Sequence, residues 1–226
     1  MPLPEDLSFS SEQFSGRARL FPLPNLVVFP HVMQPLHIFE PRYRAMLEEA
    51  LADDGLIAMT LLAPGWEADY EGRPPVRSIG CLCRVATHHR LEDGSYNVLV
   101  LGLRRIEIVE EFPADKPFRE ARVELQDDVY PEADAAERTE LQHRLLAAFK
   151  RVLPKIPEAQ EQLDQLLGST IPLGMLTDIV SYTLDIDLNF KERMLREACV
   201  DRRARELLEH LGRLRRAVFP AEFSLN

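Results

Sequence analysis

The pattern of apolar residues changes once along this 226-residue chain, near residues 126–131, and that change constrains the fold more than any other feature. Before it, short apolar runs are separated by prolines and glycines, a pattern typical of short strands. After it, apolar residues recur every three or four positions, as on one face of a helix. Strands followed by helices predict an α+β fold. We therefore expect residues 1–16 to be a flexible leader, 17–128 a strand-rich subdomain and 129–226 a helical subdomain.

Frequent prolines keep the strand candidates of the first half short. Asp93-Gly94 is a strong signal for a hairpin turn. We predict six or seven short strands with one inserted helix, which indicates a small, twisted, partly closed β-barrel whose closure hides the strand edges. The apolar runs that carry this prediction are 18–24, 26–30, 33–39, 56–62, 78–90, 95–101, 103–112 and 118–125.

The inserted helix is predicted to begin at Glu40-Pro41, because proline at the first helical position loses no hydrogen bond. It is predicted to end at Asp53-Asp54-Gly55, where the glycine suits a left-handed cap. The second half predicts a helical bundle. Its expected helices are a stripe of Leu141, Leu145, Ala148, Phe149 and Val152, a short helix at 158–167, one that begins at Pro172, one at 189–197, and a last helix with Ala204, Leu207, Leu208, Leu211 and Leu214.

Charge and cysteine usage exclude several classes of protein. The formal net charge of −10 disfavours nucleic acid as a partner, because such binding rests on neutralising phosphates. No apolar run approaches the roughly 20 residues that a membrane span needs, so we expect no membrane segment. The first 16 residues carry Glu5, Asp6 and Glu12, which does not fit a signal peptide. Three cysteines cannot all pair with one another, which favours a reduced, cytoplasmic protein.

No motif predicts catalysis or metal binding. Cys81, Cys83 and the His88-His89 pair could suggest a metal, but residues two apart on a strand point to one face, which suits a buried core better than a tetrahedral site. No Gly-x-Ser-x-Gly elbow occurs, and Gly168-Ser169-Thr170 is interpreted as a cap or turn. We expect no catalytic residue, no metal and no cofactor.

The chain opens with LFPLPNLVVFP at 20–30, followed by PLHIFEPRY at 35–43. This opening resembles the N-terminal domain of Lon proteases, and in particular its stand-alone bacterial form. With the other segments below, the resemblance covers roughly residues 18–216. The segments that carry the resemblance are 20–30, 35–43, IGCLCRV at 79–85, the turn at 92–94, NVLVLGLRRI at 97–106, LGMLTDI at 173–179 and NFKERMLRE at 189–197.

This resemblance implies a PUA-like β-barrel followed by an α-helical bundle. It also implies recognition of unfolded or extended polypeptide, with a protease or chaperone as the kind of partner that would use such a module. In full-length Lon proteases ATPase and peptidase domains follow this region. This chain shows no Gly-x-x-x-x-Gly-Lys-Ser/Thr phosphate loop, so we expect a non-catalytic module.

The candidate peptide-binding residues are Trp66, Tyr70, Val32 and Met33. Trp66 and Tyr70 lie in the Gly- and Pro-rich stretch 63–76, where aromatic side chains could bury much area against a partner. The alternative is a loop folded onto the barrel, with Trp66 as a plug. Glu40, Arg42 and Arg44 are interpreted as a helix start with solvated arginines.

Three other functions stay open at this point. An RNA-binding PUA-like module would carry a basic stripe beside the barrel, which the net acidity disfavours. An adaptor would bind one specific folded partner tightly. An enzyme would require a deep pocket with converging carboxylates and strongly shifted pKa values.

Overall fold

The computed structural model describes residues 9–12, 14–132, 135–152 and 171–218. The helix predicted at 158–167, the turn at 168–170 and most of the leader lie outside these residues. The chain divides into two compact units. The first comprises residues 1–127 and 185–196, and the second comprises 128–184 and 197–226. The chain therefore passes between the units three times.

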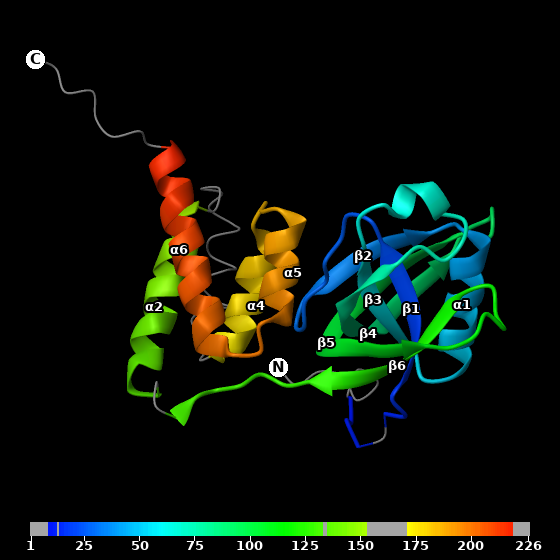
Figure 1. The fold of residues 1–226 in the computed structure, drawn as a ribbon, viewed down its shortest axis with the longest axis horizontal. Helices are drawn as coiled ribbons and strands as arrows, with labels where there is room; N and C mark the ends of the chain where they lie inside the picture. Colours follow the sequence, from blue (N-terminus) through cyan, green and yellow to red (C-terminus); the bar gives the residue numbers. More distant parts are fainter. Residues whose placement is uncertain (1–8, 13, 133–134, 153–170, 219–226) are drawn as a thin grey trace, which may run out of the picture. The chain divides into compact units, whose positions relative to one another are not determined.

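The first unit holds a six-stranded mixed sheet in the order β2-β5-β4-β3-β1-β6 (Figure 1). An additional pairing joins β6 to β5, so β1, β3, β4, β5 and β6 form a closed cycle of pairings, while β2 pairs only with β5 among the described strands. The α+β prediction is confirmed. The elements are β1 (Arg17–Leu23), β2 (Met33–Ile38), α1 (Pro41–Ala52), β3 (Leu56–Leu62), the 3-10 helix η2 (Trp66–Asp69), β4 (Val76–Arg90), β5 (Tyr96–Glu111), β6 (Arg119–Gln126) and α5 (Leu188–Arg196).

Strand β5 differs from the prediction, because the runs 95–101 and 103–112 form one strand of 16 residues. Gly102 lies within it, where a Cβ atom would overlap the carbonyl oxygen of Phe29 and lie 3.2 Å from Cys81 Sγ. The glycine therefore serves close packing and makes no turn. The first half of β5 pairs with β2 and the second half with β6.

The strand predicted at 26–30 is wrong. Val27, Val28 and Phe29 are buried, but they belong to an irregular segment between β1 and β2. The backbone of this segment is tied to β5, since the His31 N–H donates to Gly102 O at 2.8 Å and Gly102 N–H donates to Val32 O at 2.9 Å. Burial without ladder pairing explains why the apolar run resembles a strand.

Helix α1 confirms the predicted start and end. Pro41 is its first residue, and its apolar face buries Tyr43, Met46, Leu47 and Ala50. Gly55 has φ of 69°, and its N–H donates to Ala50 O at 2.7 Å. A core cluster inside the closed cycle of strands comprises Ala18, Leu20, Leu56, Ala58, Leu82, Leu101, Leu103, Ile106, Ala121 and Val123, with Phe9 and Phe14 packed against it.

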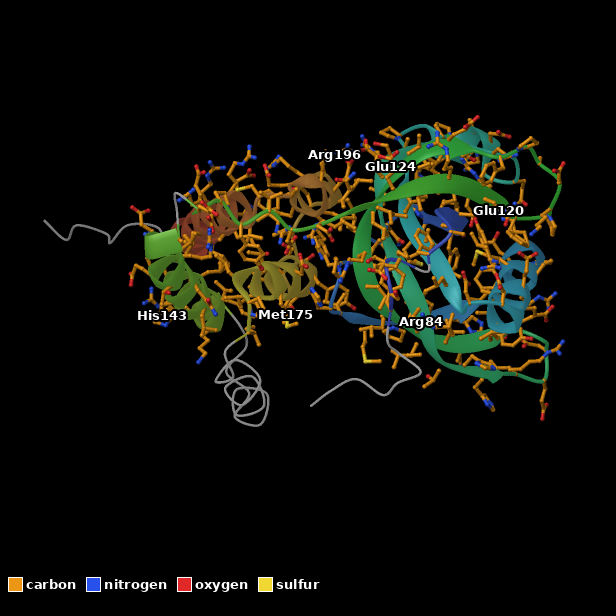
Figure 2. The ribbon with its side chains drawn as sticks, turned by 90° about the horizontal axis from the view of Figure 1, so that it is seen from below. Arg84, Glu120, Glu124, His143, Met175 and Arg196 are labelled. Carbon is orange, nitrogen blue, oxygen red and sulfur yellow. The ribbon has the colours of Figure 1, made fainter. Side chains whose placement is uncertain are left out.

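Helix α5, which sequence periodicity groups with the other helices, belongs to the first unit. Arg105 of β5 is buried, and its Nε donates to Leu195 O at 2.9 Å. Arg196, labelled in Figure 2, reaches Ser78 Oγ at 3.3 Å. Polar contacts to β4 and β5 thus hold this helix.

The second unit contains α2 (Ala135–Val152), α4 (Leu173–Thr183) and α6 (Val200–Val218), which lie side by side (Figure 1). Leu141, Leu145 and Phe149 are buried as predicted, whereas Val152 is exposed. Pro172 precedes α4 as its N-cap. None of the helices in the described ranges has the length and apolar composition to cross a lipid bilayer.

Buried ion pairs tie the second unit together. Arg203 of α6 is fully buried and donates to both carboxylate oxygens of Asp128, at 2.7 and 2.9 Å. Its Nε donates to Thr177 Oγ1 of α4 at 3.1 Å. Arg138 of α2 makes a second two-bond contact, to the buried Asp201 of α6. These pairs connect all three helices and the segment before them.

Candidate functional site: an open apolar sheet face

Strand β2 presents an open apolar surface. Met33, Pro35 and His37 are exposed at alternate positions, and Met33 has 45% of its area accessible. Phe39, just beyond the strand, is 63% exposed and stacks on His37 with ring centroids 5.9 Å apart. We call Met33, Pro35, His37 and Phe39 the β2 face.

The β2 face continues across two further strands, because directly paired residues share one side of a sheet. No carboxylate occurs among the paired side chains, although the whole chain carries a net charge of −10. From β2 outward the paired positions are Pro35, Leu99 and Thr87, then His37, Asn97 and His89. Met33 pairs with Leu101, which is buried in the core cluster. The opposite side of these strands is buried at Ile38, Tyr96, Val98 and Val100.

The free edge of β2 is blocked at its centre. Since Gly102 N–H bonds Val32 O, the alternation of antiparallel pairing turns the backbone groups of Met33, Pro35 and His37 away from β5. Pro35 has no N–H to offer there. Its carbonyl oxygen already accepts a hydrogen bond from Gln34 Nε2 at 2.7 Å. An incoming strand would therefore meet no donor at this residue, and it would compete with Gln34 for the acceptor.

The predicted aromatic loop is fastened to the start of α1. Trp66 and Tyr70 contact edge to face, with ring centroids 5.4 Å apart. Tyr70 OH donates to Glu40 Oε1 at 2.6 Å, and Arg42 Nη1 donates to Tyr70 O at 3.0 Å. Burial, followed by the Glu40 carboxylate, raises the pKa of Tyr70, so its hydroxyl remains a donor at neutral pH.

The expectation that Arg42 is solvated is wrong. Its side chain is 18% exposed, and its guanidinium carbon lies 4.7 Å from the ring centre of Tyr43 and 4.9 Å from that of Tyr70. Two aromatic faces hold the cation more favourably than a solvated position at the positive end of the helix. No sequence pattern signals this contact, since Tyr70 lies 28 positions away.

The four sequence-predicted residues occupy different environments. Trp66 and Tyr70 are half-buried and in contact, whereas Val32 is only 7% exposed and Met33 faces solvent. Sequence reasoning missed Phe39, the most exposed of the large apolar side chains in the described ranges. The available signal was the period of two, because outward positions 33, 35 and 37 place residue 39 on the same side.

The cysteines of β4 lie in the core. Cys81 and Cys83 are fully buried on one face of the strand. Burial, followed by the neighbouring Cys81, raises the pKa of the Cys83 thiol, which keeps it protonated and unreactive. His88 and His89 are exposed. Within the described residues, no group of three or more His, Cys, Asp or Glu side chains could hold a metal ion.

Comparison with known proteins gives one consistent result. The chain is 26% identical over 196 residues to a Lon protease of Anaeromyxobacter dehalogenans, which covers 87% of this chain and 23% of that protein. It is 28% identical over 197 residues to a Lon protease of Heliobacterium modesticaldum, again over 23% of the relative. The chain thus spans about a quarter of the length of these relatives.

Two solved structures share the fold. The N-terminal domain of a Mycobacterium avium complex Lon protease has a TM-score of 0.67 at 20% identity and covers 87% of this chain and 98% of that one. A Lon N-terminal domain protein from Xanthomonas campestris has a TM-score of 0.61 at 18% identity, over 85% and 97%. The family model for the substrate-binding domain of ATP-dependent protease La (LON) matches residues 17–213. The chain therefore belongs to the LON substrate-binding domain family.

Proposed function

We propose that this chain is a non-catalytic module that binds unfolded or extended polypeptide at the β2 face. The observation that carries the proposal is an open sheet face with exposed Met33 and Phe39 and no carboxylate among its paired positions. Large exposed apolar groups of this kind mark interaction sites. The family's description as a substrate-binding domain supports the same function. The proposal includes a PUA-like barrel for the cyclically paired strands, a cytoplasmic location, and use by a protease or chaperone.

Binding at this face is proposed to rest on side chains. An extended segment lays alternate apolar side chains against Met33, Pro35 and Phe39, and the burial of apolar area provides most of the affinity. Such contacts tolerate many sequences, because they impose little geometry. The aromatic loop with Trp66 and Tyr70 is a second proposed contact surface.

Replacing Met33 and Phe39 with serine is expected to weaken binding about tenfold or more. Full burial of a large apolar side chain is worth about 1.5–3 kcal/mol, and two are removed. The measurement is fluorescence anisotropy of a labelled, permanently unfolded polypeptide titrated with each variant. Val109→Ser is the matched control, because Val109 is 42% exposed on β5 outside the β2 face. Equal affinity of both variants and the unmodified protein would move the site elsewhere.

The same titration separates the other candidate functions. A labelled single-stranded RNA that binds in place of the polypeptide, with steep salt dependence, favours the nucleic-acid module. If neither ligand binds, the result favours the alternative function, an adaptor that binds one specific folded partner. Trp66→Ala measures the contribution of the aromatic loop.

The blocked edge of β2 gives a separate prediction about how the polypeptide binds. A peptide whose alternate amides are replaced by esters is expected to bind within about threefold of the parent, because no ladder of backbone hydrogen bonds forms. Strand addition would lose about 0.5–1.5 kcal/mol for each bond removed. A loss above about tenfold for three esters, measured by competition, contradicts side-chain recognition.

A further inference from the structure

A hollow of about 200 Å³ lies in the first unit, beside the loop before β4. Its volume equals that of about six or seven water molecules, which leaves room for a small polar group and the carbons next to it. Residues from α1, the loop, the segment before β6 and the first residue of β6 line it. The lining is Arg42, Tyr43, Glu71, Gly72, Arg73, Ala114, Lys116, Pro117, Phe118 and Arg119.

The lining is strongly cationic. It contains four positive side chains and one carboxylate, that of Glu71. The glutamates that pair with these cations do not line the hollow. Glu40 pairs with Arg42, and Glu111 pairs with both Arg73 and Arg119. Apart from Glu71, the hollow is therefore lined by the cations and not by the carboxylates that pair with them.

These ion pairs hold the cations in place before any ligand arrives. Lys116 Nζ lies 2.7 Å from Glu49 Oε1 and 3.3 Å from Glu120 Oε1. Burial opposes the ionisation of Glu111, but hydrogen bonds from Arg119 and then Arg73 outweigh it and lower the pKa of that carboxyl. Because the Glu111 carboxylate stays charged at neutral pH, a ligand need not order Arg73 and Arg119.

Arg42 is held by an ion pair of the same kind, since its Nη2 lies 2.9 Å from Glu40 Oε2. The floor is apolar, since Tyr43 and Phe118 are 5% and 6% exposed.

We propose that this hollow binds a carboxylate of the bound polypeptide, either its C-terminal carboxylate or an Asp or Glu side chain. The cations receive the carboxylate oxygens, and the aromatic floor accepts the adjoining carbons. This inference rests on the proposed function and adds a preference for acidic groups. It places the preference at the hollow, which shares no residue with the β2 face.

The test compares peptides that differ only in charge. One pair has the same sequence with a free-acid or an amidated C-terminus, and a second pair has an internal Glu or Gln. We expect the acid form of at least one pair to bind about tenfold more tightly. The preference should disappear in R73Q/K116Q and persist in R122Q/R202Q, which changes the net charge equally at two exposed arginines. Which pair shows the preference identifies the source of the carboxylate.

A second arm does not depend on polypeptide binding. Succinate alone is titrated while the amide signals of Gly72 and Phe118 are followed by NMR. Saturable shifts in the unmodified protein that vanish in R73Q/K116Q support the hollow even if no polypeptide binds, in which case only the proposed function fails. If peptides bind without any acid preference, or if the double substitution leaves the preference intact, the carboxylate site is overturned while the proposed function stands. If no peptide binds and succinate causes no shift, both fail.

Discussion

Replacing Arg203 with alanine is expected to lower the free energy of unfolding of the second unit by about 3–5 kcal/mol. The side chain is fully buried, and its removal takes away the guanidinium that holds both oxygens of Asp128. It also removes the donors to Thr177 Oγ1 and to Glu197 O, the latter at 3.0 Å. A buried charge that loses its partner costs much more than the pair contributes.

The neighbouring arginine is the control for this experiment. Arg202 is 66% exposed and lies 3.4 Å from Glu197, so Arg202→Ala should change stability by no more than about 0.5 kcal/mol. Urea denaturation followed by circular dichroism measures both variants. Hydrogen exchange should show the loss of protection in α4 and α6 first. Equal urea midpoints for the two variants would show that the buried network contributes little.

Gly102→Ala is expected to destabilise the first unit by about 2–4 kcal/mol, although it adds one methyl group. The new Cβ would overlap the carbonyl oxygen of Phe29, which belongs to backbone and has little freedom to move. Phe29 must shift, and the segment tied to Gly102 by hydrogen bonds at His31 and Val32 shifts with it. Because this segment leads into β2, we also expect weaker polypeptide binding.

Gly212→Ala is expected to have the opposite effect on stability. Gly212 is an exposed residue of α6, and a Cβ there meets no atom within 4 Å. Alanine favours a helix over glycine by about 1 kcal/mol, so this variant should be slightly more stable. Thermal unfolding of the two variants gives shifts of opposite sign. A neutral Gly102→Ala would mean that the Phe29 segment moves freely.

The sequence predicts local features of the fold well. The start of α1 at Pro41, its glycine cap at Gly55 and the buried run 56–62 depend on residues close in the chain. The predicted break in β5 is wrong because it depends on a contact between residues that are distant in the chain. Gly102 is explained by Phe29, which is far away in sequence, and periodicity contains no information about that contact.

The same distinction between local and distant contacts applies to the candidate site. Met33 and Tyr70 follow from residue type and loop position, and Phe39 follows from strand alternation. The prediction also includes Val32, whose side chain is only 7% exposed. The cationic hollow is assembled from α1, the loop, the segment before β6 and the first residue of β6, so no single stretch of sequence reveals it.

The three passages of the chain between the units have a consequence for biosynthesis. Strands β1 to β6 are complete at residue 126, but α5, which supplies the acceptor for Arg105, is made only after residues 128–184. Glu192 and Leu195 of α5 line one small hollow with Val27 and Val28. Val27 and Val28 are therefore not covered by α5 until that helix has been synthesised. During translation the nascent strands therefore hold an uncovered apolar surface, and the hydrogen bond from Arg105 to Leu195 O is not yet made. Closing a loop over the intervening helical segment carries an entropic cost. Until α5 has been made, this apolar surface stays available for contact with other chains.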